Sequence, residues 1–438
     1  MKQAIRGAAL TFTDDPFCVG DQQAIHYESD AIIRIENGRI REVGPSQLML
    51  SRIEPDEPLE HYPDALILPG FIDCHVHYSQ TQIIASYGEQ LLEWLEKYAF
   101  PAEGQFHDPA HAEEIAKIYL SECFRNGITS ASVYCTIFPQ SVDALFKEAE
   151  NHTMRLMAGK VMMDRNAPDY LRDSPQSSYD DSKNLIARWH KKGRFEYVIT
   201  PRFAPTSTPE QLEMCQALAH EHPDMLIQSH ISEHVREVEW VRKLFPDCSN
   251  YASVYHKYDL LRPRAVYGHG IYLEPEEREL FRAHDVSIAH CPTSNLFVGS
   301  GCFDIRKSYE NKEKPIRVGL ATDVGGGDSF SIFHTMAEAY KVAQLNGYAL
   351  SAFRAFYLAT RGAAKALHLE DKIGSLKTGM EADMVVLDMH STPLIRKRMT
   401  YSNTLEEQLF AQMILGDDRA VAATYVNGKK VYSKKESA

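Results

Sequence analysis

Histidine and carboxylate side chains stand at the ends of several short apolar segments in this sequence. In chain order they are His75, His77, His230, Glu233, His269 and Asp323. Because side chains alternate along a strand, His75 and His77 point to the same face and could bind one cation. One such pair is weak support for a metal site, since the chain has 19 histidines and chance pairs are common. The further candidates at matching segment ends favour a metal site.

Three imidazoles and one carboxylate form the candidate ligand set. The predicted ligands are His75, His77, His230 and Asp323. These ligand types suit zinc and also iron, so the residues alone leave the metal open. The ion would keep one position for water and lower the pKa of that water from 15.7 to about 7, which provides a nucleophile near neutral pH. Asp323 precedes three glycines and could instead be a turn residue or helix cap.

Two further residues are candidates for proton transfer. Glu233 lies three residues after His230, where its carboxyl group could reach a substrate without binding the metal. We predict that it is the proton shuttle, a role that contributes roughly 10²- to 10⁴-fold to the rate. The alternative is a solvated glutamate at the start of a helix. His269 is predicted to hydrogen-bond the metal water or to be a further ligand, and otherwise is a satisfied core histidine.

Eight strand candidates alternate with helix-like segments in the middle of the chain. They are 65–77, 127–134, 155–163, 195–203, 224–232, 265–273, 286–294 and 316–324. Segment 109–127 contains good helix formers and ends in glycine, as a helix does. Eight such units predict an α/β fold of the (β/α)8 TIM barrel type, with its chemistry at the C-terminal strand ends. An open doubly wound sheet is the alternative, but its glycine-rich fingerprint is missing from the sequence.

The two ends of the chain differ from the middle, because apolar and polar residues alternate there. Each end contains an Asn-Gly pair typical of a hairpin turn. These pairs are Asn37-Gly38 and Asn427-Gly428. Neither end has enough strand to bury a face alone. We therefore expect residues 1–67 and 378–438 to form one small β-sandwich domain, and residues 68–377 to form the barrel.

The charge and composition of the chain limit which classes of molecule we expect it to bind. The formal net charge is -13, with 47 basic and 60 acidic residues and no basic run. This argues against nucleic acid or an anionic membrane as partner and favours a small, uncharged substrate. The eight cysteines are scattered singly, which indicates reduced thiols. The first residues lack a signal-peptide pattern, so we expect a soluble protein of the cytoplasm.

Seven segments of the chain resemble those of one family. They are PGFIDCHVHYSQ, LLEWLEKYAFPAE, TPRFAPTS, QSHISEH, YGHG, HCPTSNL and TDVGGG. Together they are similar to the guanine deaminases, in the ATZ/TRZ-like branch of the amidohydrolase superfamily, and the similarity runs nearly end to end. The two histidines with the later His, His and Asp define only the superfamily. The LLEWLEKYAFPAE and TPRF segments are much more specific.

The resemblance implies a cytoplasmic homodimer that uses one zinc ion per subunit to hydrolyse guanine to xanthine and ammonia. It implies zinc ligands at His75, His77, His230 and Asp323, with His269 close by and Glu233 as proton donor. The implied substrate contacts are Gln80, Arg202 and Phe203, together with the proton donor Glu233 and with His77, His230 and Asp323 of the metal site. Relatives with two metals carry a lysine at the end of strand four. Here Arg202 stands there and Lys160 lies on strand three, which argues against a second metal.

The proposed recognition of guanine has physical support in the residue types. Arg202 presents a planar fork of donors that matches the O6 and N7 acceptors of guanine, whereas adenine would present a donor. Sites built on such hydrogen bonds discriminate by roughly 10⁴ or more. Gln80 could read the other purine edge. The alternative pairs Arg202 with a structural carboxylate and leaves Gln80 solvated.

The segment from Glu89 to Glu103 follows the first strand and could cover the site. Its apolar residues have helical spacing, which is more often a core pattern. We expect Trp94 or Phe100 to close over the substrate ring. Other functions stay open on the same barrel: hydrolysis of a triazine or another aminated purine, or a scaffold that has lost its chemistry.

Overall fold

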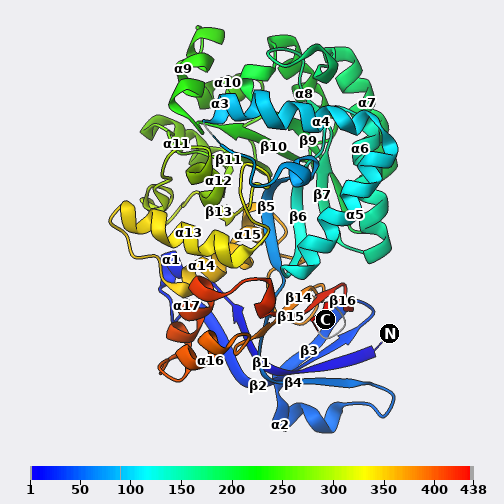
Figure 1. Ribbon diagram of the computed structural model, residues 1–438, viewed down its shortest axis with the longest axis vertical. Helices are drawn as coiled ribbons and strands as arrows, with labels where there is room; N and C mark the ends of the chain where they lie inside the picture. The colour runs from blue at the N-terminus through cyan, green and yellow to red at the C-terminus, as the bar shows by residue number, and fades with distance from the viewer. Residues whose placement is uncertain (1, 89, 435–438) are drawn as a thin grey trace.

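A ring of parallel strands forms the larger part of the molecule, and the strands follow one another in chain order around it (Figure 1). The computed structural model describes residues 2–88 and 90–434. The ring strands are β5 (Phe71–His77), β6 (Ile128–Tyr134), β7 (Arg155–Gly159), β9 (Phe195–Pro201), β10 (Leu226–Ile231), β11 (Ala265–His269), β12 (Ser287–His290) and β13 (Val318–Leu320), with the short β8 (Val161–Met162) beside β9. All eight predicted barrel strands are confirmed, and the fold is a (β/α)8 barrel.

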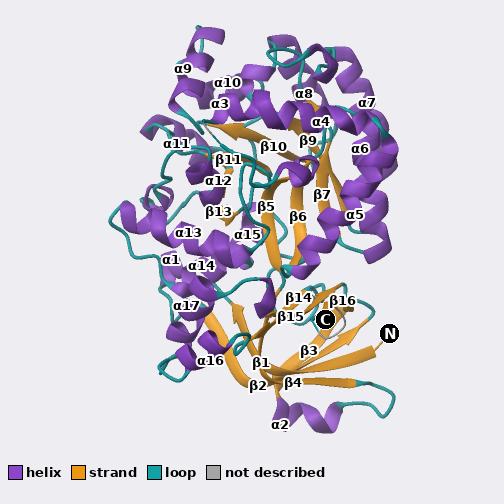
Figure 2. Cartoon of the chain, viewed as in Figure 1, coloured by secondary structure: helices purple, strands orange, loops and turns teal. Residues whose placement is uncertain are grey.

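Helices surround the ring, as the alternating pattern predicts (Figure 2). They are α5 (Pro109–Arg125), α6 (Pro139–His152), α7 (Pro175–Trp189), α8 (Pro209–Glu221), α9 (Val235–Leu244), α10 (Tyr251–Lys257), α11 (Pro275–Ala283), α12 (Pro292–Phe297), α13 (Ile332–Leu345), α14 (Ala352–Ala359) and α15 (Arg361–Ala366). The predicted helix 109–127 is confirmed: Asp108 caps it with its carboxylate, and Pro109 takes the first helical position. At the base of the barrel, Leu367 after α15 packs with interior side chains such as Ile72.

Backbone hydrogen bonds close the ring between its first and last strands. The N–H of Asp323 donates to the carbonyl of His75 at 3.0 Å, and the N–H of His77 donates to the carbonyl of Val324 at 2.8 Å. Three of these four residues are predicted zinc ligands. The seam of the barrel and the candidate metal site are therefore built from the same stretch of backbone.

The second sheet contains strands from both ends of the chain (Figure 1). Its order is β16 (Lys429–Ser433), β15 (Val421–Val426), β14 (Met384–Asp388), β4 (Leu59–Pro69), β1 (Lys2–Phe12), β2 (Ile25–Glu36) and β3 (Arg39–Pro45). The two Asn-Gly turns meet through Ala382, which donates to the carbonyl of Gly38 and accepts from the N–H of Gly428, each at 2.8 Å. Strands from both chain ends thus form one small β unit, as expected, but the structure has one continuous seven-stranded sheet with its own apolar cluster rather than two stacked sheets.

The two sheets are joined directly, because only Gly70 separates β4 from β5. The single strand predicted over 65–77 therefore serves both sheets. The C-terminal part also contains two helices that the alternating pattern did not predict, α16 (Pro393–Met399) and α17 (Leu405–Leu415). Phe410 on α17 packs edge-on against Tyr340 on α13, with ring centroids 5.0 Å apart. Within the described ranges 2–88 and 90–434, no helix is both long enough and apolar enough to cross a membrane.

A buried ion-pair network links the C-terminal segment to the base of the barrel. Glu381 accepts two hydrogen bonds from Arg155, at 2.7 and 2.5 Å, and two from Arg194, at 3.0 and 2.6 Å. Burial alone would raise the pKa of Glu381, but the hydrogen bonds and charges of the two arginines lower it to about 2. The carboxylate is therefore ionised in the folded protein at neutral pH.

Replacement of Glu381 by glutamine is expected to destabilise the fold by about 1–3 kcal/mol, because Arg155 and Arg194 lose their shared partner and keep only Glu196 and Asp383, respectively, as acidic neighbours. The free energy of unfolding in urea at pH 7 measures this loss. Since the folded pKa lies below the ordinary value of 4.5, the wild type should lose the same contribution as the pH falls from 4.5 towards 2. Exposed Glu313 offers the matched control, Glu313→Gln. Equal stability of the two variants would contradict the role of the network.

Candidate active site

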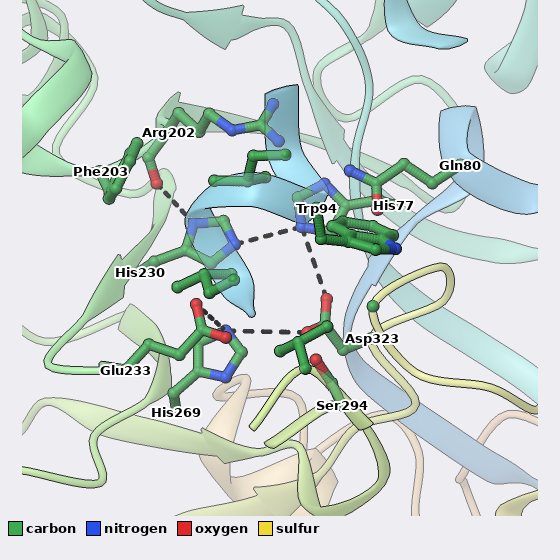
Figure 3. A pocket seen from close by; sticks show the side chains of 14 residues that line it. His77, Gln80, Trp94, Arg202, Phe203, His230, Glu233, His269, Ser294 and Asp323 are labelled. Atoms are coloured by element: carbon green, nitrogen blue, oxygen red, sulfur yellow. Dashed lines mark hydrogen bonds and ion pairs between the residues drawn. The ribbon is translucent and has the colours of Figure 1, made fainter. Parts of the chain in front are cut away.

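A pocket lies at the C-terminal ends of the ring strands, where this type of barrel places its chemistry (Figure 3). Its lining consists of His77, Gln80, Leu91, Trp94, Leu95, Arg202, Phe203, His230, Glu233, His269, Ser294, Val298, Asp323 and Gly326. This lining includes every predicted catalytic and substrate-binding residue. The remaining predicted ligand, His75, is buried beside it. Residues from five different strand ends are thus brought together in one pocket.

The four predicted zinc ligands meet at one end of this pocket. The Nε2 atoms of His77 and His230 are 3.1 Å apart. Oδ1 of Asp323 lies 3.3 Å from Nε2 of His75 and 3.6 Å from Nε2 of His77. Ligand atoms of the three histidines all lie within 4.8 Å of one another. This spacing allows the side chains to share a single ion.

The hydrogen bonding and protonation of these residues fit a metal ion. Among the described residues, Nε2 of His75 is buried without a hydrogen-bond partner. Nδ1 of His230 is bonded to the carbonyl of Arg202 at 2.5 Å, which leaves Nε2 for the site. Burial lowers the pKa of all three histidines, so their lone pairs are available. Although burial opposes it, the charge of the neighbouring histidines, His75 first, holds the pKa of Asp323 well below its usual range.

Three residues at or just past the strand ends have left-handed backbone conformations. The φ angles are 50° at Ser232, 72° at His269 and 49° at Asp323. Such conformations are uncommon outside glycine and cluster at functional sites. Gly268 is required for space, because a Cβ atom there would lie 2.7 Å from Cε1 of His75. At His269 and Asp323, this uncommon backbone conformation accompanies side chains that line the pocket.

Glu233 has the environment of a group that exchanges protons. Burial raises its pKa to about 7, so both protonation states are populated near neutral pH. Oε1 accepts a hydrogen bond from the Ser300 hydroxyl at 2.9 Å. The N–H of Glu233 donates to the carboxylate of Glu237 at 2.8 Å, which fixes the turn before α9. The alternative of a solvated glutamate is therefore wrong.

His269 lies between the two acidic groups of the pocket. Its Nε2 atom is 3.5 Å from Oε2 of Glu233 and 3.7 Å from Oδ2 of Asp323. Its Nδ1 atom is 2.8 Å from Oδ1 of Asn295, which orients the ring. Burial alone would lower the pKa of His269, but the two carboxylates raise it above its ordinary value. This environment separates His269 from the three histidines whose pKa is lowered.

Arg202 and Gln80 both bind one buried carboxylate. Nη1 of Arg202 donates to Oε2 of Glu103 at 2.6 Å, and Nε2 of Gln80 donates to Oε1 of the same residue at 2.8 Å. The alternative interpretation of Arg202 is thus right about its partner, but Gln80 is buried rather than solvated. Both side chains still line the pocket. They can contact Glu103 and a ligand together, because each has donors to spare.

The segment after β5 covers the pocket with three short helical stretches. They are α3 (Leu91–Trp94), the π-helical η3 (Leu95–Ala99) and α4 (Phe100–Gly104). Trp94 lines the pocket, as expected of a residue that closes over the ring. Phe100 instead packs on Arg202, with the guanidinium carbon 5.4 Å from the ring centroid. Leu91 and Leu95 complete this wall.

Several residues that support the site were not predicted from the sequence. They are Glu103, Ser294, Asn295 and Ser300. Ser294 and Asn295 belong to the HCPTSNL segment and Glu103 to LLEWLEKYAFPAE, so these motifs were a signal that could have found them. Lys160 bonds to Asp173 and is not part of the pocket lining.

Comparisons with known proteins agree with this geometry. Residues 66–431 match the amidohydrolase family. Guanine deaminase of Escherichia coli (strain K12) is 46% identical over 435 residues, which cover 99% of this chain and 98% of the relative. A solved structure of E. coli guanine deaminase superposes with a TM-score of 0.96 at 45% identity, covering 99% of this chain and 100% of that one. Guanine deaminase from C. acetobutylicum, with bound guanine in its active site, gives a TM-score of 0.88 at 27% identity and the same coverage. The chain therefore belongs to the amidohydrolase family and, within it, to the guanine deaminases.

Proposed function

We propose that the protein hydrolyses guanine to xanthine and ammonia. The observation that carries this proposal is one buried pocket with a metal-type ligand cluster at one end and the Arg202–Gln80 pair at the other. Relatives that share nearly the whole chain are guanine deaminases, and one similar structure contains guanine in its active site. The pocket thus combines side chains suited to bind a hydrolytic metal ion with side chains suited to hydrogen-bond one edge of a purine.

We further propose zinc as the metal, with one ion per chain. His75, His77, His230 and Asp323 would hold it. Three neutral imidazoles and one carboxylate are ligands that zinc accepts in catalytic sites. When bound, the ion supplies a water molecule whose pKa is low enough for attack near neutral pH.

In this mechanism the side chains of the pocket move the protons. Glu233 gives its proton to the ring nitrogen beside C2 of guanine while the water oxygen adds to C2. Asp323 accepts a proton from the water and passes it to the departing amine, so the C2–N bond breaks and ammonia leaves. The proton that remains on the new C2 hydroxyl returns to Glu233, which forms the carbonyl of xanthine and restores the acid. The pKa of about 7 makes Glu233 an acid at neutral pH, whereas the lowered pKa of Asp323 makes it an acceptor. His269, between the two carboxylates, is placed to hydrogen-bond the water.

Arg202 is proposed to recognise the O6 and N7 acceptors of guanine, with Gln80 and Phe203 beside it. Replacement of Arg202 by alanine is expected to raise the KM for guanine by about 10- to 100-fold, the size of a lost hydrogen bond to a charged group. Steady-state kinetics measure this change, and zinc content should stay at the wild-type level. Arg242, exposed on α9 and paired with Glu274, provides the control Arg242→Ala. An unchanged KM in the Arg202 variant would contradict this recognition.

The experiment that tests the function is an ultraviolet and ammonia assay of zinc-loaded protein with guanine. Adenine and an aminated triazine are assayed in parallel, because the same barrel could act on either type of compound. Xanthine and equimolar ammonia from guanine alone would support the proposal. Turnover of adenine or the triazine, with no turnover of guanine, would show that the proposed substrate is wrong. A purified protein that binds no metal would favour a scaffold without catalytic activity. A homodimer and a location in the cytoplasm stay predictions.

A further inference from the structure

Glu103 is a buried acid that does not line the pocket but contacts two residues that do. It is fully buried in α4, on the segment that covers the site. Its two carboxylate oxygens are divided between two partners: Oε1 accepts from Gln80 and Oε2 accepts from Arg202. A side chain in this position can act on a ligand only through those partners.

The contact with Arg202 neutralises and orients a buried cation. One of its five N–H donors is used by Glu103, and Arg202 also lines the pocket, where it has further donors for a ligand. Phe100, three residues before Glu103 on the same helix, packs on the guanidinium group. The guanidinium is thus held by a carboxylate and by an aromatic ring, both supplied by α4.

The contact with Gln80 determines which end of the amide faces which neighbour. An ionised carboxylate only accepts hydrogen bonds, so the amide nitrogen must point to Glu103. The amide oxygen then faces the N–H of Gly325, at 3.3 Å. Glu103 and Gly325 favour the same orientation of the Gln80 amide. If the amide were reversed, its oxygen would face the Glu103 carboxylate and its nitrogen would face the N–H of Gly325.

We propose that Glu103 is the positioning residue that sets the purine preference, by fixing Arg202 and Gln80 so that an acceptor rather than a donor is favoured at C6 of the substrate. The inference rests on the proposed function and names what selects the substrate. Guanine and 2,6-diaminopurine make the sharpest comparison, because both carry the C2 amine and they differ at C6, where one has oxygen and the other an amine. Fixed N–H donors on Arg202 and Gln80 should favour guanine, which has an acceptor oxygen at C6. They should disfavour 2,6-diaminopurine, because a donor that faces the C6 amine leaves buried groups unpaired.

The test replaces Glu103 by glutamine, which has nearly the same size but adds donors that must face Arg202 or Gln80. We expect kcat/KM for guanine to fall by about 10- to 100-fold, mainly through KM. The preference for guanine over 2,6-diaminopurine should fall by roughly 10-fold or more. Zinc content should stay unchanged. Glu96, exposed on the same segment, supplies the control Glu96→Gln, which should match the wild type in all three readouts.

A double-mutant cycle with Arg202→Ala separates positioning from a general structural role. If Glu103 acts through Arg202, Glu103→Gln should cost less than about 3-fold in the Arg202→Ala background, because the group that it positions is gone. Glu103→Asp, which keeps the charge, should recover part of the preference. Wild-type activity on guanine combined with an unchanged preference in Glu103→Gln, or with fully additive effects in the cycle, would overturn this inference alone. Wild-type inactivity on guanine would overturn the proposed function, and this inference with it.

Discussion

Replacement of Glu233 by glutamine should lower kcat for guanine by about 10²- to 10⁴-fold, because the group that protonates the ring nitrogen is lost. The amide keeps the shape of the side chain and can still accept the hydrogen bond from Ser300. Neither the ligand cluster nor the Arg202–Gln80 pair loses a residue, so zinc content and KM should stay close to the wild-type values. The effect should therefore appear in kcat, measured by the release of xanthine at saturating guanine.

The matched control for this variant is Glu239→Gln. Glu239 lies on α9, the helix that follows Glu233, but its side chain is exposed to solvent. The control should retain full activity. A Glu233→Gln enzyme that carries zinc and turns over guanine at the wild-type rate would show that Glu233 is not the proton donor.

The second large effect is expected at the ligand cluster. Replacement of His230 by alanine removes one of three imidazoles whose ligand atoms lie within 4.8 Å of one another. Bound zinc should drop well below one ion per chain, and activity should fall by roughly 10⁴-fold or more, because free water has a pKa of 15.7 rather than about 7. Metal analysis after dialysis and kcat for guanine are the two measurements.

Chelation and reloading complete this test on the unmodified protein. Removal of the metal should abolish turnover, and added zinc should restore it in proportion to the ion bound. His220→Ala is the matched control, because this histidine lies on the exposed face of α8 and pairs with Asp259. Full activity of metal-free protein would exclude a hydrolytic role for the cluster.

The barrel, and the meeting of the proposed zinc ligands in one pocket, could be predicted because their signals are local. A strand that ends in His75-Val76-His77 places both imidazoles on one face, whatever the rest of the fold does. The C-terminal ends of parallel strands in a barrel all lie on one side, so His230 and Asp323 follow from the same rule. Both Asn-Gly turns were recognisable for a similar reason, since two residues suffice to define a hairpin.

The motifs pointed to the segments that contain Glu103 and Asn295, but the roles of the supporting residues could not be predicted, because those roles depend on contacts between distant segments. Nothing in the sequence around Glu103 shows that its two oxygens face Gln80 and Arg202. Asn295 and Ser300 are ordinary polar residues until the fold brings them beside His269 and Glu233. Helices α16 and α17 were not predicted for another reason. They lie within a C-terminal segment whose clearest sequence patterns indicated strands.

The seam between β5 and the chain after β13 has a consequence for how the protein is made. A ribosome releases His75 and His77 long before Asp323, yet the backbones of His75 and Asp323 are bonded to each other in the finished barrel. Until that late segment emerges, the outer edge of β5 lacks its final neighbour and stays open to wrong pairing. A nascent chain cut short before residue 323 would carry His75 and His77, two of the proposed zinc ligands, without the carboxylate that would complete the set. Under the proposed zinc assignment, only a chain that has been translated past the last barrel strand can therefore bind the ion with its full ligand set.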